Sequence, residues 1–366
     1  MRRFSVARAS AGLGLAVILT LGAAELSGSG PFAASAQSVR DTLYLPIVRR
    51  AVVSAGPVAS PTVAPTPVPS RALSWSTRSR LPSARESVGA ATGPDGRIYV
   101  FGGYAASSER LTATEIYDPA TDTWTPGQSM PTVRQAFAVA IAPNGKIYVA
   151  GGIRDNQIVG TFEEYDPATD TWQTRASLAT PRSALALAEA NGKLYALGGA
   201  DRRERPLATL EEYDPATDTW RARASLPVPA AGPRVAHAAV GLDGKIYVLG
   251  GFNPNSGIGI LSGVEEYDPA TNTWSPRQRM PTARQNLGVV AGPNGRIYAL
   301  GGFNDAEGGI LRVVEEYDRL SNTWRRQTSM PTARLGLAVA FSGGRMYAVG
   351  GGSHRGPLSV VEEATP

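Results

Sequence analysis

Short apolar stretches separated by turn sequences recur along most of this chain. One example is AFAVAIA after Gln135, which a turn at Asn144-Gly145 separates from the second apolar stretch IYVAGG. Stretches of this length are typical of β-strands, and such dipeptides accept positive φ angles and close tight hairpins. The dipeptides are Asp95-Gly96, Asn144-Gly145, Asn191-Gly192, Asp243-Gly244, Asn294-Gly295 and Gly343-Gly344. The pattern therefore predicts six β-hairpins.

Each predicted hairpin belongs to a longer repeat. The second apolar stretch ends in Gly-Gly, and a loop of variable length leads to a third stretch that ends in Glu-Glu-Tyr-Asp-Pro or a near copy. The sequence Ala-Thr-Asp-Thr-Trp or a variant then begins a fourth strand. The glycine pairs start at residues 102, 151, 198, 250, 301 and 350, and tryptophans at 75, 124, 172, 220, 274 and 324 follow the same period of about 50 residues.

This period predicts an all-β fold, a six-bladed β-propeller with four antiparallel strands in each blade. A single blade is apolar on both faces, so blades must stack in a ring. Trp75 has no glycine pair before it, and Gly350-Gly351 has no tryptophan after it. We therefore expect the segment around Trp75 to complete the last blade and close the ring.

Over residues 73–366 the chain resembles the kelch family of six-bladed β-propellers. The resemblance rests on the glycine pairs, the spaced tryptophans, the Tyr-Asp-Pro turns that begin at 117, 165, 213 and 267, and Tyr-Asp-Arg at 317. It implies a binding surface built from variable loops on a rigid ring. The fold is compatible with many functions, so it does not by itself identify a ligand.

The residues before the propeller have a different composition. Residues 1–36 combine early arginines, a short apolar stretch and Ala-Ser-Ala, the layout of a secretory signal peptide. Residues 37–55 form a short apolar and basic segment of unknown role, and residues 56–72 are a proline-rich linker. We expect a secreted or cell-envelope protein with no transmembrane segment after signal cleavage.

The charge distribution argues against a nucleic-acid partner. The sequence pI is about 9.5, but residues 1–72 contain seven arginines and only two acidic residues. The remaining part of the chain, 73–366, has 29 basic and 29 acidic residues and is therefore neutral overall. The chain has no cysteine, which excludes disulfides, thiolate metal sites and the cysteine-dependent chemistry of the copper oxidases that share this scaffold. We expect no metal or cofactor.

One arginine recurs in every repeat just before the first apolar stretch. These residues are Arg85, Arg134, Arg182, Arg234, Arg284 and Arg334. Placed around the mouth of the central channel, they would bind carboxylates, and the resemblance to protein-binding kelch domains implies acidic peptides. A glutamate also recurs six times, at Glu115, Glu163, Glu211, Glu265, Glu315 and Glu362. Because buried charges are generally paired, we favour structural Arg–Glu pairs for most of this set.

Residues that break the repeat are better candidates for specificity. The candidates are Tyr104, Arg154, Asp155, Asn156, Arg202, Arg203, Arg205, Phe252, Asn253, Phe303, Asn304, His354 and Arg355. As a rim of aromatic, amide and guanidinium groups they would suit a sugar or an acidic peptide. The other histidine, His237, lies on an apolar strand and is interpreted as a core residue with satisfied hydrogen bonds.

Three functions remain open at this point. The first is a monomeric, non-catalytic module that recognises an extracellular protein or glycan, an acidic partner being one option. The second is a metal-free enzyme acting on sugars, since an exported sialic acid mutarotase shares the kelch scaffold. In that case Glu86, the only acidic residue directly after a recurring arginine, would be the catalytic base. The third is an extracellular scaffold.

Overall fold

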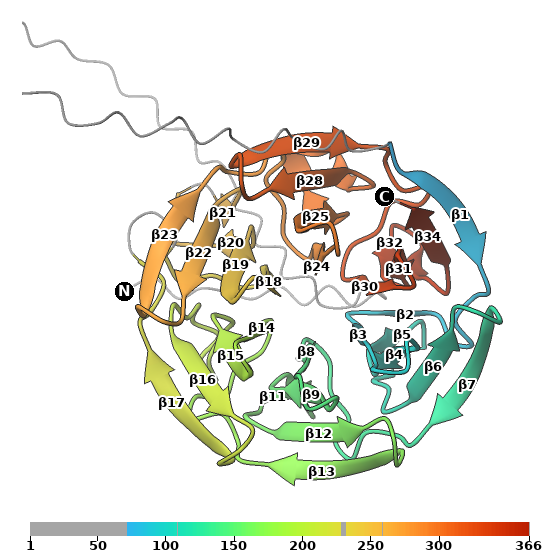
Figure 1. The fold of residues 1–366 in the computed structure, drawn as a ribbon, viewed down its shortest axis with the longest axis horizontal. Coiled ribbons are helices and arrows are strands. Elements are labelled where there is room, and N and C mark those ends of the chain that lie inside the picture. Colours follow the sequence, from blue (N-terminus) through green and yellow to red (C-terminus); the bar gives the residue numbers. More distant parts are fainter. Residues whose placement is uncertain (1–71, 108, 228–231, 258, 366) are drawn as a thin grey trace, which may run out of the picture. The chain divides into compact units, whose positions relative to one another are not determined.

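The computed structural model describes residues 72–107, 109–227, 232–257 and 259–365. Within these residues, six four-stranded antiparallel sheets surround a central axis as the blades of a propeller (Figure 1). The predicted fold is therefore confirmed. The predicted signal peptide, the segment 37–55 and residues 56–71 of the predicted linker lie outside the described residues.

The strands of each blade follow one another from the axis outwards, apart from the outermost strand of blade 6. Blade 1 contains β3 (Gly89–Thr92), β4 (Ile98–Phe101), β6 (Thr114–Asp118) and β7 (Thr123–Gly127). Blade 2 contains β8 (Ala138–Ile141), β9 (Ile147–Ala150), β12 (Phe162–Asp166) and β13 (Thr171–Arg175). Blade 3 contains β14 (Ala186–Ala190), β15 (Lys193–Leu197), β16 (Leu210–Asp214) and β17 (Thr219–Arg223).

The second half of the ring repeats this order. Blade 4 contains β18 (Ala238–Leu242), β19 (Lys245–Leu249), β22 (Val264–Asp268) and β23 (Thr273–Arg277). Blade 5 contains β24 (Gly288–Ala291), β25 (Arg296–Leu300), β28 (Val314–Asp318) and β29 (Thr323–Gln327). Blade 6 contains β30 (Ala338–Ser342), β31 (Arg345–Val349), β34 (Val361–Thr365) and, as its outermost strand, β1 (Ser74–Arg78).

Strand β1 closes the ring. It pairs antiparallel with β34, so that Ser74 lies opposite Thr365 and Arg78 opposite Val361. Beyond the backbone ladder, Arg78 donates from Nε and Nη2 to the two carboxylate oxygens of Glu363 at 2.8 and 2.9 Å. The first described strand and the last therefore share one blade, as the missing tryptophan of the sixth repeat predicts.

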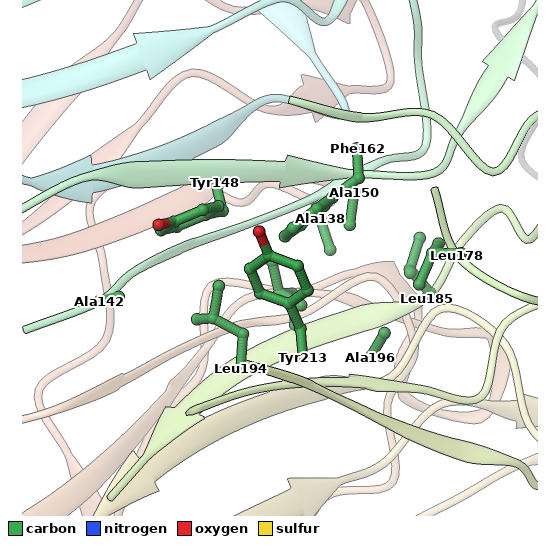
Figure 2. Close-up of a cluster of buried hydrophobic side chains, with 11 residues drawn as sticks. Ala138, Ala142, Tyr148, Ala150, Phe162, Leu178, Leu185, Leu194, Ala196 and Tyr213 are labelled. Carbon is green, nitrogen blue, oxygen red and sulfur yellow. The ribbon is translucent and has the colours of Figure 1, made fainter. Parts of the chain in front are cut away.

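Apolar and aromatic side chains fill the space between neighbouring blades. Between blades 2 and 3, Phe162 meets the edge of Tyr213 at a ring-centroid distance of 4.7 Å and stacks on Tyr148 at 5.4 Å (Figure 2). Leu194 of blade 3 packs in the same cluster. Burial of such rings is the main favourable contribution to folding, and each interface between blades contains a cluster of this kind.

The recurring Tyr and Trp also tie each blade to its neighbour by hydrogen bonds. In blade 2, the indole Nε1 of Trp172 donates to the carbonyl of Gln128 at 2.8 Å. Asp170, whose φ of 53° places it in the left-handed region, accepts from the Tyr165 hydroxyl at 2.6 Å and from the Gln128 N–H at 2.7 Å. The motif Tyr-Asp-Pro-Ala-Thr-Asp-Thr-Trp thus recurs because it joins a turn to the preceding blade.

Short two-stranded sheets extend from the side of the ring where the variable loops emerge. Four are hairpins, which pair β10 (Ile153–Arg154) with β11 (Gln157–Ile158), β20 (Phe252–Asn253) with β21 (Gly259–Ile260), β26 (Phe303–Asn304) with β27 (Gly309–Ile310), and β32 (Gly352–Ser353) with β33 (Gly356–Pro357). In blade 1, β2 (Arg85–Glu86) pairs with β5 (Tyr104–Ala105), although β3 and β4 lie between them in the chain. A 3-10 turn, η1 (Asp305–Glu307), lies between β26 and β27. We call the side that carries these short sheets the loop face. None of the described residues forms a helix long and apolar enough to cross a membrane.

Candidate ligand-binding face

The six recurring arginines are fully buried. Each has an exposed fraction of 0 % and lies four residues before the innermost strand of its blade. Each guanidinium pairs with the recurring glutamate of the same blade. The pairs are Arg85–Glu115, Arg134–Glu163, Arg182–Glu211, Arg234–Glu265, Arg284–Glu315 and Arg334–Glu362. The expected structural pairing is therefore confirmed for all six.

These arginines also bind the backbone of the glycine pair. In blade 5, Arg284 donates from Nη1 to the carbonyls of Gly301 and Val313, both at 3.1 Å. One guanidinium therefore joins the end of β25 to the segment that leads into β28. Gly301 has a φ of 57°, and a Cβ there would lie 2.4 Å from the carbonyl oxygen of Arg334. Glycine, arginine and glutamate recur together because they form one buried unit.

Burial sets the protonation chemistry of these pairs. Desolvation lowers the pKa of Arg134 and of the other five arginines, and it raises the pKa of Glu115 and Glu265. A side chain with no exposed surface offers nothing to a ligand in solution. The hypothesis that this set forms a carboxylate-binding ring at the channel mouth is therefore replaced by a structural role.

The channel mouth is instead bordered by the residues two positions after each arginine, which have positive φ angles. These residues are Ser87, Ala136, Ala184, Ala236, Asn286 and Gly336. Their backbones form hydrogen bonds from blade to blade, including Ala184 N–H to Ala136 O at 2.8 Å and Ser87 N–H to Gly336 O at 2.9 Å. The inner edge of the loop face thus presents mostly backbone and small side chains.

Two of the predicted rim residues are structural. Asn253 and Asn304 are buried, with exposed fractions of 6 % and 8 %. Asn253 accepts from the N–H of Asn255 at 2.9 Å, while Asn304 accepts from Ala306 N–H at 3.0 Å and donates to Ala283 O at 2.7 Å. Both amides hold their own loops, which corrects the expectation that they bind ligand.

The other rim residues lie on different blades and do not form one cluster. Arg154 is exposed and pairs with Asp155 at 3.2 Å, whereas Tyr104 of blade 1 is half-buried. Asn156 accepts at 2.8 Å from Nη2 of Arg110, a blade 1 loop residue that was not among the predicted rim residues. His354 is exposed on blade 6 and lies against Gly309 of blade 5.

The third blade brings several predicted residues together. Thr180, Pro181, Asp201, Arg202, Arg203 and Arg205 line a shallow cavity of about 340 Å³. The three arginines are exposed, and Asp201 is buried at their base. We call this cavity the blade 3 pocket.

Glu86 is the acidic group nearest the inner edge among the predicted residues. It is half-buried, its backbone lies opposite Tyr104 in the β2–β5 pair, and its carboxylate lies against Gly352. Desolvation raises the pKa of this carboxyl. A raised pKa favours proton transfer near neutral pH, so the side chain suits a general acid or base. Burial raises the pKa of carboxyls that have no catalytic role in the same way.

His237 is buried between blades 3 and 4. Desolvation, with smaller contributions from the charges of Arg234 and Arg182, lowers its pKa to about 3, and the backbone of Leu197 opposes the shift. Neither ring nitrogen makes a hydrogen bond of normal geometry to a described residue. The prediction of a core histidine is confirmed, but the prediction that its hydrogen bonds are satisfied is wrong.

No group of three His, Cys, Asp or Glu side chains in the described part of the chain is arranged to hold a metal ion. The loop face carries exposed arginine, amide and carboxylate groups. Such groups recognise anions and polar ligands by charge and hydrogen bonds.

Comparison with known proteins places this geometry in a family. A model of the KLHDC2/KLHL20/DRC7 Kelch-repeats domain matches residues 173–351, and the Kelch motif matches residues 89–131 and 136–179. Kelch-like protein 28 of Homo sapiens is 40% identical over 77 residues, which are 20% of this chain and 13% of that protein. N-acetylneuraminate epimerase of Pasteurella multocida (strain Pm70) is 37% identical over 76 residues, 20% of each chain.

These relatives are therefore matched over no more than a fifth of their length. The solved structure of YjhT superimposes with a TM-score of 0.65 at 18% identity, covering 79% of this chain and 97% of that one. This likeness concerns the fold alone. Together with the six blades and their Gly-Gly, Arg and Glu units, the matches show that the chain belongs to the kelch-repeat family.

Proposed function

We propose that this protein is a secreted, non-catalytic recognition module that binds an extracellular protein or glycan through the loop face of its propeller. One observation carries the proposal. The repeated charges are buried and paired inside the blades, whereas the loop face carries exposed charges that differ from blade to blade. A rigid ring with variable, exposed loops is the usual design of a binding scaffold.

Exposed arginines on the loop face favour an acidic partner. The loops of blades 1 to 3 contain Arg110, Arg154, Arg202, Arg203 and Arg205 beside Glu109, Asp155, Asp201 and Glu204, while the described loop residues of blade 4 between Phe252 and Leu261 have no charged side chain. The arginines lie closest together on blade 3, and exposed guanidinium groups attract acidic ligands. Export through the signal peptide predicted at residues 1–36 would place such a ligand outside the cell.

The test is a binding screen of the full chain against arrays of glycans and of acidic peptides. Any ligand found is then measured against Arg154→Ala and Arg203→Ala on the loop face. Arg326→Ala removes the same charge from the exposed outermost strand of blade 5 and is the matched control. The proposal predicts weaker binding only for the loop-face variants. Equal loss in the Arg326 variant, or no loss in either loop variant, would contradict it.

A second candidate is an enzyme that acts on sugars, and the half-buried Glu86 favours it. This carboxyl has a raised pKa beside the inner edge of the loop face, and N-acetylneuraminate epimerase is among the similar proteins. The measurement is the rate at which N-acetylneuraminate exchanges its anomers, followed by proton NMR with and without the protein. An acceleration that Glu86→Gln abolishes would establish this activity in place of the non-catalytic role.

A further inference from the structure

The blade 3 loop differs from every other described loop in its density of arginine. Arg202, Arg203 and Arg205 occupy three of four consecutive positions, and all three side chains are exposed. Together with Asp201, Thr180 and Pro181 they enclose the blade 3 pocket of about 340 Å³. Three positive charges therefore face one negative charge around a single concavity.

Asp201 fixes the conformation of this loop. Its Oδ1 accepts from the N–H of Arg203 at 2.8 Å and from the N–H of Arg205 at 3.0 Å, and its Oδ2 accepts from Nε and Nη2 of Arg205. The backbone closes the same turn, because Asp201 N–H donates to Arg205 O at 3.0 Å. Arg205 and Asp201 therefore satisfy each other, and the turn is ordered before any ligand arrives.

The opposite wall is equally rigid because it is attached to a buried charge pair. Ala179 and Thr180 donate their N–H groups to Glu211 at 2.9 and 3.2 Å, and the carbonyl of Thr180 accepts from Nε of Arg182 at 3.3 Å. The Arg182–Glu211 pair inside blade 3 thus positions Thr180 and Pro181. A site with two preformed walls loses little conformational entropy on binding.

Two arginines of the pocket retain donors for a ligand. Arg202 makes one long hydrogen bond, from Nε to the carbonyl of Ile158 at 3.4 Å, which leaves both of its Nη groups available. The guanidinium of Arg203 has no hydrogen bond or ion pair to any other residue that the structure describes. After the Asp201–Arg205 pair, the positive charges of Arg202 and Arg203 remain in the pocket lining, and the exposed Glu204 beside them carries one negative charge outside that lining.

We propose that the blade 3 pocket is the subsite that receives two neighbouring carboxylates of an acidic peptide segment, with Arg203 and Arg202 each binding one. This inference rests on the proposed recognition function and names its ligand. Each guanidinium presents a planar fork that matches a carboxylate in a bidentate geometry. A monosaccharide acid brings one carboxylate and leaves the second arginine uncompensated. The pocket lining also contains no aromatic ring on which a sugar would pack.

The experiment uses the full chain and a fluorescein-labelled peptide, Gly-Ser-Glu-Glu-Ser-Gly. The protein is titrated into the labelled peptide up to millimolar concentration in low salt, and binding is followed by fluorescence polarisation. The peptide Gly-Ser-Gln-Gln-Ser-Gly controls for charge, and glucuronate as competitor represents a single sugar carboxylate. We expect saturable binding of the Glu peptide only. Stronger competition by glucuronate than by unlabelled Glu peptide would overturn the peptide assignment in favour of an acidic sugar. Absence of saturable binding would overturn the peptide assignment outright.

Variants locate the binding. We expect Arg203→Ala to weaken binding of the Glu peptide about tenfold or more. Arg203→Lys should recover part of this affinity, because lysine keeps the charge but not the planar fork of donors. Arg326→Ala should bind the peptide like the parent chain. Thermal unfolding should be the same for all, since these side chains are exposed. If Arg154→Ala weakens binding and Arg203→Ala does not, the subsite is refuted while the recognition function stands. If neither variant changes the binding of any array ligand, the recognition function itself fails.

Discussion

Two sets of arginines in this propeller perform opposite tasks. The arginine of each Arg–Glu pair is fully buried, bound to a glutamate and to backbone carbonyls, and repeated in all six blades. The arginines of the blade 3 pocket are exposed, occur in one blade, and are only partly compensated by Asp201. The same side chain therefore maintains the fold where it is enclosed and is available to a ligand where it is not. Repetition along the chain marks the first role, and departure from repetition marks the second.

Breaking a buried pair should produce the largest effect. Arg284→Ala leaves Glu315 buried without its partner, and we expect a loss of about 3–5 kcal/mol in the free energy of unfolding. Urea-induced unfolding followed by tryptophan fluorescence measures it. The double variant Arg284→Met with Glu315→Leu, which removes both charges, should cost much less. A change below about 1 kcal/mol in the single variant would show that the pair does not stabilise the fold.

The buried His237 should make the free energy of unfolding depend on pH. The unfolded pKa of His237 is about 6.5 and its folded pKa about 3, so the folded state binds fewer protons. Its contribution to stability is therefore complete above pH 6.5 and is lost as the pH falls from 6.5 towards 3. The loss should be on the order of 2 kcal/mol by pH 5.

The matched variant is His237→Leu, because leucine occupies the equivalent position of blades 3, 5 and 6 at Leu185, Leu287 and Leu337. Urea unfolding at pH 7 and pH 5 should give a smaller difference in this variant than in the parent chain. The same pH dependence in both proteins would assign the acid sensitivity to other groups.

A buried loop amide should have an intermediate effect. Asn304→Ala removes the acceptor for Ala306 N–H at the start of η1 and the donor to Ala283 O. We expect a loss of about 1 kcal/mol, measured by urea unfolding. Ligand binding should change little if the amide only supports its loop, and a large loss of affinity without a loss of stability would return Asn304 to the binding surface.

The exposed arginines should contribute least to stability. Arg203→Ala should change the free energy of unfolding by less than about 0.5 kcal/mol, in contrast to Arg284→Ala. Differential scanning calorimetry of the two variants in one buffer makes this comparison directly. A comparable loss in both would erase the distinction between the two sets.

Much of the fold is predictable from the sequence, because each repeated residue has a repeated structural role. The turn dipeptides, the glycine pairs and the tryptophans mark the strands, and the unmatched Trp75 indicates the closing strand. The Arg–Glu pairs were also accessible from their joint recurrence. The complete burial of these pairs was not predictable, because spacing along a chain indicates which residues share a blade but not in which direction a side chain points.

The site was less predictable for a related reason. Asn253 and Asn304 break the repeat, yet their amides are used within their own loops. A signal for this was present, since an asparagine followed by a turn often accepts from the N–H two residues later. Asp201 carries the same signal, since its Oδ1 accepts from the N–H of Arg203 two residues later. Arg110 carries none, because its contact with Asn156 joins two different blades.

The pairing of β1 with β34 separates the order of the chain from the order of the ring. Ser74 and Thr365 lie opposite each other, so a short connection between them would leave every blade complete and allow new ends to be opened elsewhere. A circular permutant opened in the exposed turn at Asp305–Glu307 would retain all six sheets while making β1 an internal strand. In such a protein a domain fused to the new ends would project from the loop face. The position of the ends, and with it the attachment point of the propeller, can therefore be chosen.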